Sequence, residues 1–177
     1  MSFWCKMNTD IGTYFNEDRT GFFLAVVRVI IALMFLWAFA DKLFGLGFPT
    51  PSDMGYIDGG SPTKDFLAAN DGWFAPLFNA MANIYQITDV LIIVGLLLIG
   101  GSLLIGTASK ITTVASLVLL TMFYMSELPL ADNPILDFRL VYMAALAAAY
   151  FGNGFGRISL KGRWDELEVV KKHPILG

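Results

Sequence analysis

Four long apolar segments constrain the fold of this chain more than any other feature. They cover approximately residues 21–39, 84–105, 108–125 and 140–155. A helix of about 20 residues spans the hydrocarbon core of a bilayer. None of the four alternates apolar and polar residues with a period of two, which argues against a transmembrane β-barrel. We therefore predict an all-α fold, a transmembrane four-helix up-down bundle that contacts the lipid bilayer.

The composition agrees with a membrane protein in a single domain over residues 1–177. Of the 177 residues, 56% are hydrophobic and 15% are charged, and the mean hydropathy is +0.62. Soluble domains have about 25% charged residues. The net charge of −3 gives no basic surface for nucleic acid, so no nucleic-acid partner is expected. One cysteine and one histidine are too few for a usual zinc site, so no metal is expected either.

The basic residues predict the orientation of the bundle. If four segments cross the membrane, the two termini and the turn near residue 108 lie on the same side. That side carries most of the 12 Lys and Arg residues, namely Lys6, Arg19, Lys110, Arg157, Lys161, Arg163, Lys171 and Lys172. The positive-inside rule then places both termini in the cytoplasm of a bacterium or archaeon, with residues 45–83 outside and the tail 157–177 inside.

Three further segments predict short helices that lie along the membrane surface. Apolar residues recur at helical spacing in residues 3–15 and again in the tail from Leu160 to Val170. In the outer segment, Ser61 and Pro62 have the pattern of an N-cap followed by a first helical residue, with aromatic residues after them. The alternative interpretation of that outer helix is a lid over the bundle. Glycines at 95, 100 and 101 favour close helix packing, and Gly106 predicts a tight hairpin.

Arg28 lies inside the first apolar segment, where a charge costs about 2.5–3.5 kcal/mol on insertion scales. Three explanations are open. The side chain can extend to the membrane surface, bind a backbone carbonyl, or bind an anionic headgroup.

Charged and tyrosine side chains gather where the four segments end on the outer side. Because the segments alternate in direction, we predict that these side chains form one polar pocket, made of Asp41, Lys42, Tyr85, Asp89, Tyr124, Glu127, Asp137, Arg139 and Tyr142. One interpretation is that Lys42 and Arg139 neutralise the acids and fix the helices. The other is a site for a small polar ligand or a quinone head. In that site Asp89 and Glu127 would relay protons as catalytic residues, and the other seven residues would bind substrate.

Three stretches carry a resemblance to a known family. They are Trp37-Ala38-Phe39-Ala40-Asp41-Lys42-Leu43-Phe44-Gly45, Gly59-Gly60-Ser61-Pro62-Thr63, and Asn133-Pro134-Ile135-Leu136-Asp137 leading into Val141-Tyr142. The chain resembles the DoxX/DoxD family of small four-helix membrane proteins, most strongly the DoxD-like subunit of thiosulfate:quinone oxidoreductase. The resemblance implies a cytoplasmic-membrane subunit that passes electrons from thiosulfate to quinone together with a second subunit.

The resemblance includes one departure. Relatives carry Asp-Asp-His after the Asn-Pro motif, whereas this chain has Asp137-Phe138-Arg139. An arginine there favours an anion or a fixed ion pair. The alternative function is a non-catalytic accessory subunit of a larger membrane complex, with the terminal helices as contact surfaces.

Overall fold

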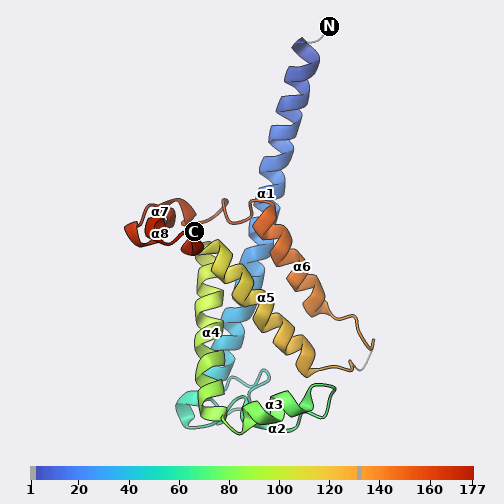
Figure 1. Cartoon of the computed structure of the whole chain (residues 1–177), viewed down its shortest axis with the longest axis vertical. Helices are drawn as coiled ribbons and strands as arrows, with labels where there is room; N and C mark the ends of the chain where they lie inside the picture. The colour runs from blue at the N-terminus through green and yellow to red at the C-terminus, as the bar shows by residue number, and fades with distance from the viewer. Residues whose placement is uncertain (1–2, 131–132) are drawn as a thin grey trace.

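The computed structural model describes residues 3–130 and 133–177, and describes residues 3–18 and 174 by their backbone alone (Figure 1). This part of the chain contains helices and no strand, which confirms the all-α prediction. The long helices are α1 (Phe3–Phe44), α4 (Tyr85–Ile105), α5 (Ser109–Ser126) and α6 (Phe138–Phe151). The short ones are η1 (Tyr56–Asp58), α2 (Lys64–Ala68), α3 (Ala75–Ala82), α7 (Lys161–Asp165), α8 (Glu168–Lys172) and η2 (Pro174–Leu176).

Three of these helices are long and apolar enough to cross a membrane: residues 19–44 of α1, α4 and α5. Their outward surfaces are apolar as well. On α4, Ile87, Leu91 and Leu98 are about two-thirds exposed and lie along one face. Such a continuous apolar surface is unfavourable in water and favourable against lipid tails. The helices therefore indicate a membrane protein.

The segment predicted as a fourth span over residues 140–155 forms a shorter helix. α6 ends at Phe151 after 14 residues, which is about 21 Å of helix against a hydrocarbon core of about 30 Å. Gly152 is its C-cap, and Asn153 takes a positive φ of 60° that turns the chain away. α6 packs against α1 and α5.

The predicted surface helix at the N-terminus is wrong as a separate element. Residues 3–44 form one continuous helix, whose N-terminal part extends away from the other helices (Figure 1). The reason is that residues 3–44 contain no proline, so nothing forces the helix to end before the apolar segment begins.

The outer segment, which we call the lid (residues 45–84), contains two helices instead of the single one predicted. α2 begins at Lys64 and α3 at Ala75, and Ser61 is not the N-cap of either. The apolar side chains of the lid point in two directions, some into the protein and others outward. Leu67 and Phe78 are buried in a small cluster, whereas Phe66, Trp73 and Leu77 are exposed. The lid lies at one end of the molecule, which we call the lid end (Figure 1).

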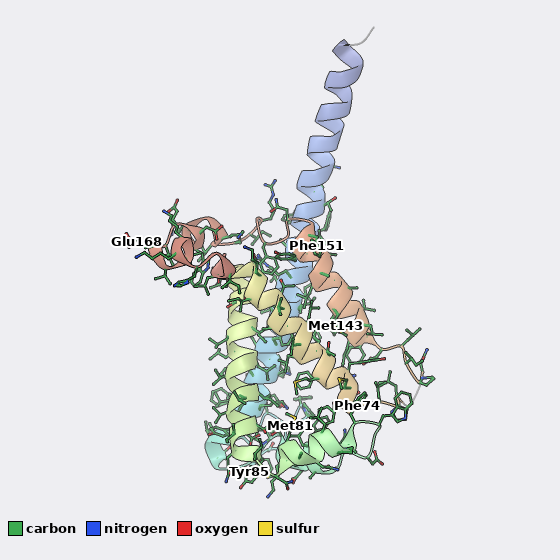
Figure 2. The ribbon with its side chains drawn as sticks, viewed as in Figure 1. Phe74, Met81, Tyr85, Met143, Phe151 and Glu168 are labelled. Carbon is green, nitrogen blue, oxygen red and sulfur yellow. The ribbon has the colours of Figure 1, made fainter. Side chains whose placement is uncertain are left out.

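The other end of the packed helices, which we call the tail end, holds α7, α8 and the hairpin between α4 and α5. Figure 2 shows Phe151 and Glu168 at this end, and Phe74, Met81 and Tyr85 at the lid end. The tail forms two short helices in place of the continuous stripe predicted. Val170 is buried, and the Trp164 indole N–H donates to the carbonyl of Leu176 at 2.7 Å, but Leu160 and Leu167 are exposed.

The main core joins α1, α4, α5 and α6. Its buried members include Ile31, Phe35, Leu96, Leu120 and Leu146. Of the three glycines predicted to allow close packing, Gly100 does so, because a Cβ there would lie 2.8 Å from Cγ of Leu36 on α1. A Cβ at Gly95 or Gly101 would meet no atom within 4 Å.

At the tail end, buried Arg28 binds the backbone, which is one of the three explanations offered by the sequence. Its Nη2 donates to the carbonyl of Ile158 at 2.7 Å, and its guanidinium lies 5.3 Å from the ring centroid of Phe155. Gly106 ends α4 with a φ of +71° and begins the tight hairpin predicted. A Cβ at Gly106 would lie 2.2 Å from Nη1 of Arg28, so the hairpin and the buried cation fit together only with glycine there.

Gly106→Ala should therefore destabilise the protein. The left-handed backbone alone costs a residue with a Cβ about 1–2 kcal/mol, and displacing Arg28 adds to that cost. Gly95→Ala is the matched control, because it replaces a mid-helix glycine in open space and should be neutral or stabilising. Thermal unfolding in detergent, followed by circular dichroism, measures both. Equal melting temperatures for the two variants would contradict this account of the hairpin.

Candidate functional site

The candidate site lies at the lid end and depends first on Asp41, which is fully buried in the last turns of α1. Its Oδ1 accepts the N–H of Phe48 at 2.8 Å, and its Oδ2 accepts the N–H of Thr50 at 2.9 Å. Hydrogen bonds to a carboxylate are stronger than those between neutral groups. Asp41 therefore folds the beginning of the lid back over the end of its own helix.

Asp89, in the first turns of α4, holds a second part of the lid. Its Oδ2 accepts the hydroxyl of Ser61 at 2.5 Å, while its Oδ1 accepts the hydroxyl of Thr63 at 2.5 Å and the N–H of Thr63 at 3.1 Å. The carboxylate is almost completely buried. The hydroxyl that looked like a helix cap in the sequence instead satisfies this buried charge.

The lid has a third attachment, at the end of α5. The N–H of Trp73 donates to the carbonyl of Leu128 at 3.0 Å, and the Asn70 side-chain amide donates to the carbonyl of Ser126. A Cβ at Gly72 would lie 2.1 Å from that same Leu128 oxygen, so the turn can approach α5 only because glycine lacks a side chain. The lid is thus fixed to α1, α4 and α5.

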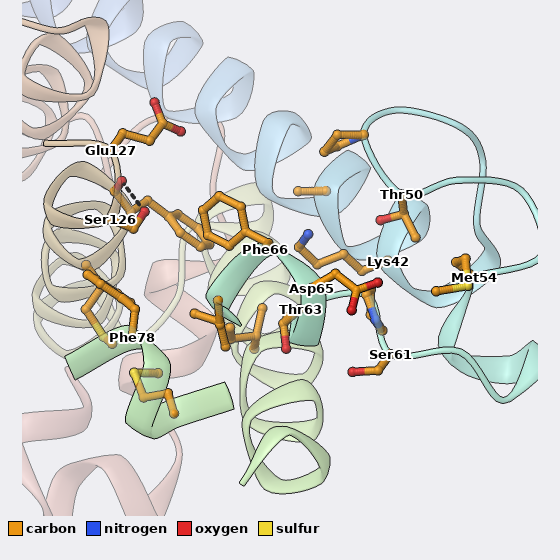
Figure 3. Close-up of a pocket in the computed structure, with 18 of the residues that line it drawn as sticks. Lys42, Thr50, Met54, Ser61, Thr63, Asp65, Phe66, Phe78, Ser126 and Glu127 are labelled. Carbon is orange, nitrogen blue, oxygen red and sulfur yellow. Dashed lines mark hydrogen bonds between the residues drawn. The ribbon is translucent and has the colours of Figure 1, made fainter. Parts of the chain in front are cut away.

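Beneath the lid lies a cavity of about 470 Å³, which we call the lid cavity (Figure 3). This volume is within the range of small-molecule sites. Most of the walls are apolar, formed by Ala38, Pro49, Pro51, Met54, Pro62, Phe66, Leu67, Phe78, Met81, Ile92, Leu119, Met122 and Phe123. The charged side chains on the walls are Lys42 from α1, Asp65 from α2 and Glu127 from the end of α5.

Lys42 is the cation of this cavity. Its side chain lies among the cavity-lining residues, near Phe66 and Thr50 in the view of Figure 3. Asp41 and Asp89 interact with it electrostatically. Among the described side chains (residues 19–130, 133–173 and 175–177) and the described backbone, no group forms a hydrogen bond or an ion pair with its ammonium group. Its three N–H donors are therefore available to a ligand in the lid cavity.

A second charged group joins the ends of α5 and α6. Arg139 forms ion pairs with both Glu127 and Asp137, and its guanidinium also lies 4.7 Å from the ring centroid of Phe138. The Arg139 and Asp137 side chains are largely buried, whereas Glu127 is 42% exposed. Nearby, the Tyr124 hydroxyl donates to the carbonyl of Ile135. The fixed ion pairing that the sequence offered for both Lys42 and Arg139 is thus present at Arg139, whereas Lys42 has no ion pair among the described side chains.

The single polar pocket predicted from the sequence is divided into two groups. Asp41, Lys42 and Asp89 lie together under the lid, and Glu127, Asp137 and Arg139 form the second group. The two groups are connected through the lid cavity, because Lys42 of the first group and Glu127 of the second both line it.

The three tyrosines expected to bind substrate do not line the lid cavity. Tyr85 has the ammonium of Lys64 at 4.7 Å from its ring centroid. Tyr124 binds the loop after α5, and Tyr142 packs edge-on against Phe138 with ring centroids 5.5 Å apart. Asp89, expected to relay protons, directs its oxygens to the lid.

The sequence does not reveal the apolar walls or the polar partners that the lid supplies. Phe66 and Phe78 are among the aromatic residues predicted to lie at the membrane surface, because their helical spacing does not show which face is covered. The Ser61-Pro62-Thr63 motif carries a partial signal, since both hydroxyls are hydrogen-bond donors close to one another in the chain.

Asp89→Asn should release the lid without unfolding the helices. An amide offers one acceptor oxygen in place of two charged ones, so the bonds from Ser61 and Thr63 cannot all form. A charge-assisted bond contributes about 1.5–3 kcal/mol, so hydrogen exchange at the Thr63 amide should become about tenfold faster or more.

The matched control is Asp58→Asn, an exposed carboxylate in the same lid. Exchange at Thr63 should be unchanged in that variant. If Asp89→Asn left the protection of Thr63 intact, the carboxylate would not be an anchor of the lid.

No family model, no curated protein and no solved structure matches this chain. What the site can do therefore follows from its own residues. A mostly apolar cavity of this size that contains one available ammonium group suits an amphipathic molecule with a hydrogen-bond acceptor at its polar end. The described residues include no group of three His, Cys, Asp or Glu side chains placed to hold a metal ion.

Proposed function

We propose that this chain is a DoxD-like membrane subunit of a quinone-linked oxidoreductase that acts on thiosulfate or a related small sulfur anion. The lid cavity is the quinone site in this proposal. α6 joins the three longer helices as the fourth member of an up-down bundle in the cytoplasmic membrane. The lid then lies outside and both termini lie in the cytoplasm, as the distribution of Lys and Arg favours.

One observation carries the proposal: Lys42 lines an otherwise largely apolar cavity with its donors available. A quinone head needs a donor for its carbonyl oxygens and apolar walls for its ring. The ammonium of Lys42 meets the first need, and Phe66, Phe78 and Met122 meet the second.

The chemistry assigns different tasks to the cavity residues. A quinone becomes a quinol by taking up two electrons and two protons, and two thiosulfates supply the two electrons when an S–S bond joins them as tetrathionate. Lys42 orients the quinone carbonyl. Asp65 and Glu127 are the carboxylates on the cavity wall that can pass protons to it from the lid side. The sulfur anion is oxidised on a second subunit in this scheme.

The positions of the three family-like stretches support the proposal. Lys42 of the first stretch and Ser61 and Thr63 of the second line the lid cavity, and Asp41 beside Lys42 holds Thr50 of its wall. In the third stretch, Asn133 Oδ1 accepts the N–H groups of Ile135 and Leu136, both at 3.1 Å, and shapes the approach to Asp137. The first two stretches therefore contribute to one cavity, and the third leads to Asp137, which pairs with Arg139.

A second candidate is a non-catalytic accessory subunit of a larger complex. The ion pairs of Arg139 with Glu127 and Asp137 favour it, because they neutralise the charges that a catalytic site would use. Exposed apolar side chains of the tail, such as Leu160, Leu167 and Val169, would then contact another subunit.

Lys42→Met should weaken binding of a short-chain benzoquinone to the purified protein by about tenfold or more. The substitution keeps most of the unbranched side chain and removes its charge and donors, and hydrogen bonds to charged groups contribute about 1.5–3 kcal/mol. Calorimetric titration measures the dissociation constant. Lys171→Met, at the tail end, should have no effect, and Lys42→Arg should retain part of the affinity.

The same variants test catalysis in the complex with its partner subunit. Thiosulfate-dependent quinone reduction should fall in Lys42→Met and persist in Lys171→Met. A folded wild-type protein that binds no quinone, or a Lys42→Met variant that binds it unchanged, would contradict the proposed site.

A further inference from the structure

A second, smaller cavity lies beside the lid cavity, and we call it the slot. It has a volume of about 150 Å³ and is bordered by α1, α4, α5 and α6. Its walls are formed by Ile31, Met34, Phe35, Ala38, Leu96, Leu120, Phe123, Phe138, Arg139 and Tyr142. Apart from Arg139 and the Tyr142 hydroxyl, these side chains are apolar, so the slot suits a hydrocarbon chain.

The slot and the lid cavity share two wall residues. Ala38 of α1 and Phe123 of α5 line both cavities. The methyl group of Ala38 and the ring of Phe123 therefore border both spaces. Phe123 is only partly buried, and rotation of such a ring about its side-chain bonds is a small, fast motion.

The slot also reaches the surface of the helices on the side where lipid would lie. Two of its wall residues, Met34 and Phe138, are 41% and 55% exposed. Met34 lies within the part of α1 that is apolar enough to cross a membrane. A chain in the slot would therefore continue into the hydrocarbon region of a bilayer.

We propose that the ligand of the lid cavity is a lipid-soluble molecule with an isoprenoid or similar hydrocarbon tail. Its polar head binds at Lys42, and its tail passes Phe123 and Ala38, fills the slot and leaves the protein between α1 and α6. Phe123 is the residue that determines tail specificity. This inference rests on the proposed quinone site and adds to it the class of ligand and its route.

The alternative is a water-soluble ligand that enters through the lid. The exposed Asp65 and Phe66 lie at the lid side of the same cavity, so such a route exists geometrically. Two observations favour the lipid route. The slot is lined by apolar groups along almost its whole length, and it meets the lid cavity at a small residue.

The experiment compares two benzoquinones with the same head, one without a tail and one with a decyl tail, bound to the full chain in lipid nanodiscs. Phe123→Trp places a larger ring at the junction. Phe123 lines the head cavity as well, so the readout is the ratio of the two dissociation constants, decyl over tailless, which should rise about tenfold relative to wild type. Because this ratio is compared between variant and wild type in the same lipid, the partitioning of each compound into lipid cancels.

Two further variants make the result independent of the folding of Phe123→Trp. Ala38→Leu narrows the junction from α1 and should have the same tail-selective effect. Phe151→Trp is the matched control, because Phe151 is 84% exposed at the other end of α6 and should alter neither affinity.

The outcomes separate the two proposals. If both compounds bind in a Lys42-dependent manner but neither Phe123→Trp nor Ala38→Leu discriminates between them, the tail route is wrong and the head site stands. An equal loss for both compounds also overturns the tail route, because Phe123 would then act on the head alone. If neither compound binds the wild-type protein, the proposed quinone site fails as well.

Discussion

The lid end depends on two buried carboxylates that accept hydrogen bonds from the lid. Asp41 receives two backbone N–H groups, and Asp89 receives one N–H group and two hydroxyls. A carboxylate buried without partners would cost several kcal/mol, so each one requires the lid to be in place. The lid in turn depends on the two carboxylates. Its 40 residues form only short helices with a small core of their own, so these charges help to determine where it lies.

This arrangement explains why Asp41 is hydrogen-bonded to the lid whereas the neighbouring Lys42 keeps its donors available. The two residues are adjacent on a helix and therefore point in different directions. Asp41 faces the lid backbone and is fully hydrogen-bonded, while Lys42 faces the cavity with its donors available. The charges of Asp41 and Asp89 interact favourably with the ammonium group without forming an ion pair with it. The lid anchors thus help to keep a cation in a largely apolar space, where an unbalanced charge would be costly.

The sequence predicted the helices well where hydropathy alone determines them. The bounds of α4 and α5 agree closely with the predicted segments, and Gly106 marked the hairpin because a left-handed turn needs glycine. The sequence predicted less about side-chain contacts, because these depend on partners that are distant in the chain. The polar residues at the lid end were identified by type, but their division into two groups depends on whether each side chain meets the lid or another helix. No periodicity shows that Asp89 would bind residues near position 62, or that Arg139 would join two carboxylates across α5 and α6.

The attachments of the lid also determine which parts of the molecule can move independently. The hydrogen bonds that hold the described part of the lid end on α1, α4 and the last turns of α5, and none of them ends on α6. α6 is joined to α5 at the lid end by Arg139. A shift of α6 against α1 would therefore change the width of the space between these two helices without breaking a hydrogen bond of the lid. Such a division would let the protein accept chains of different thickness and still recognise one kind of polar end.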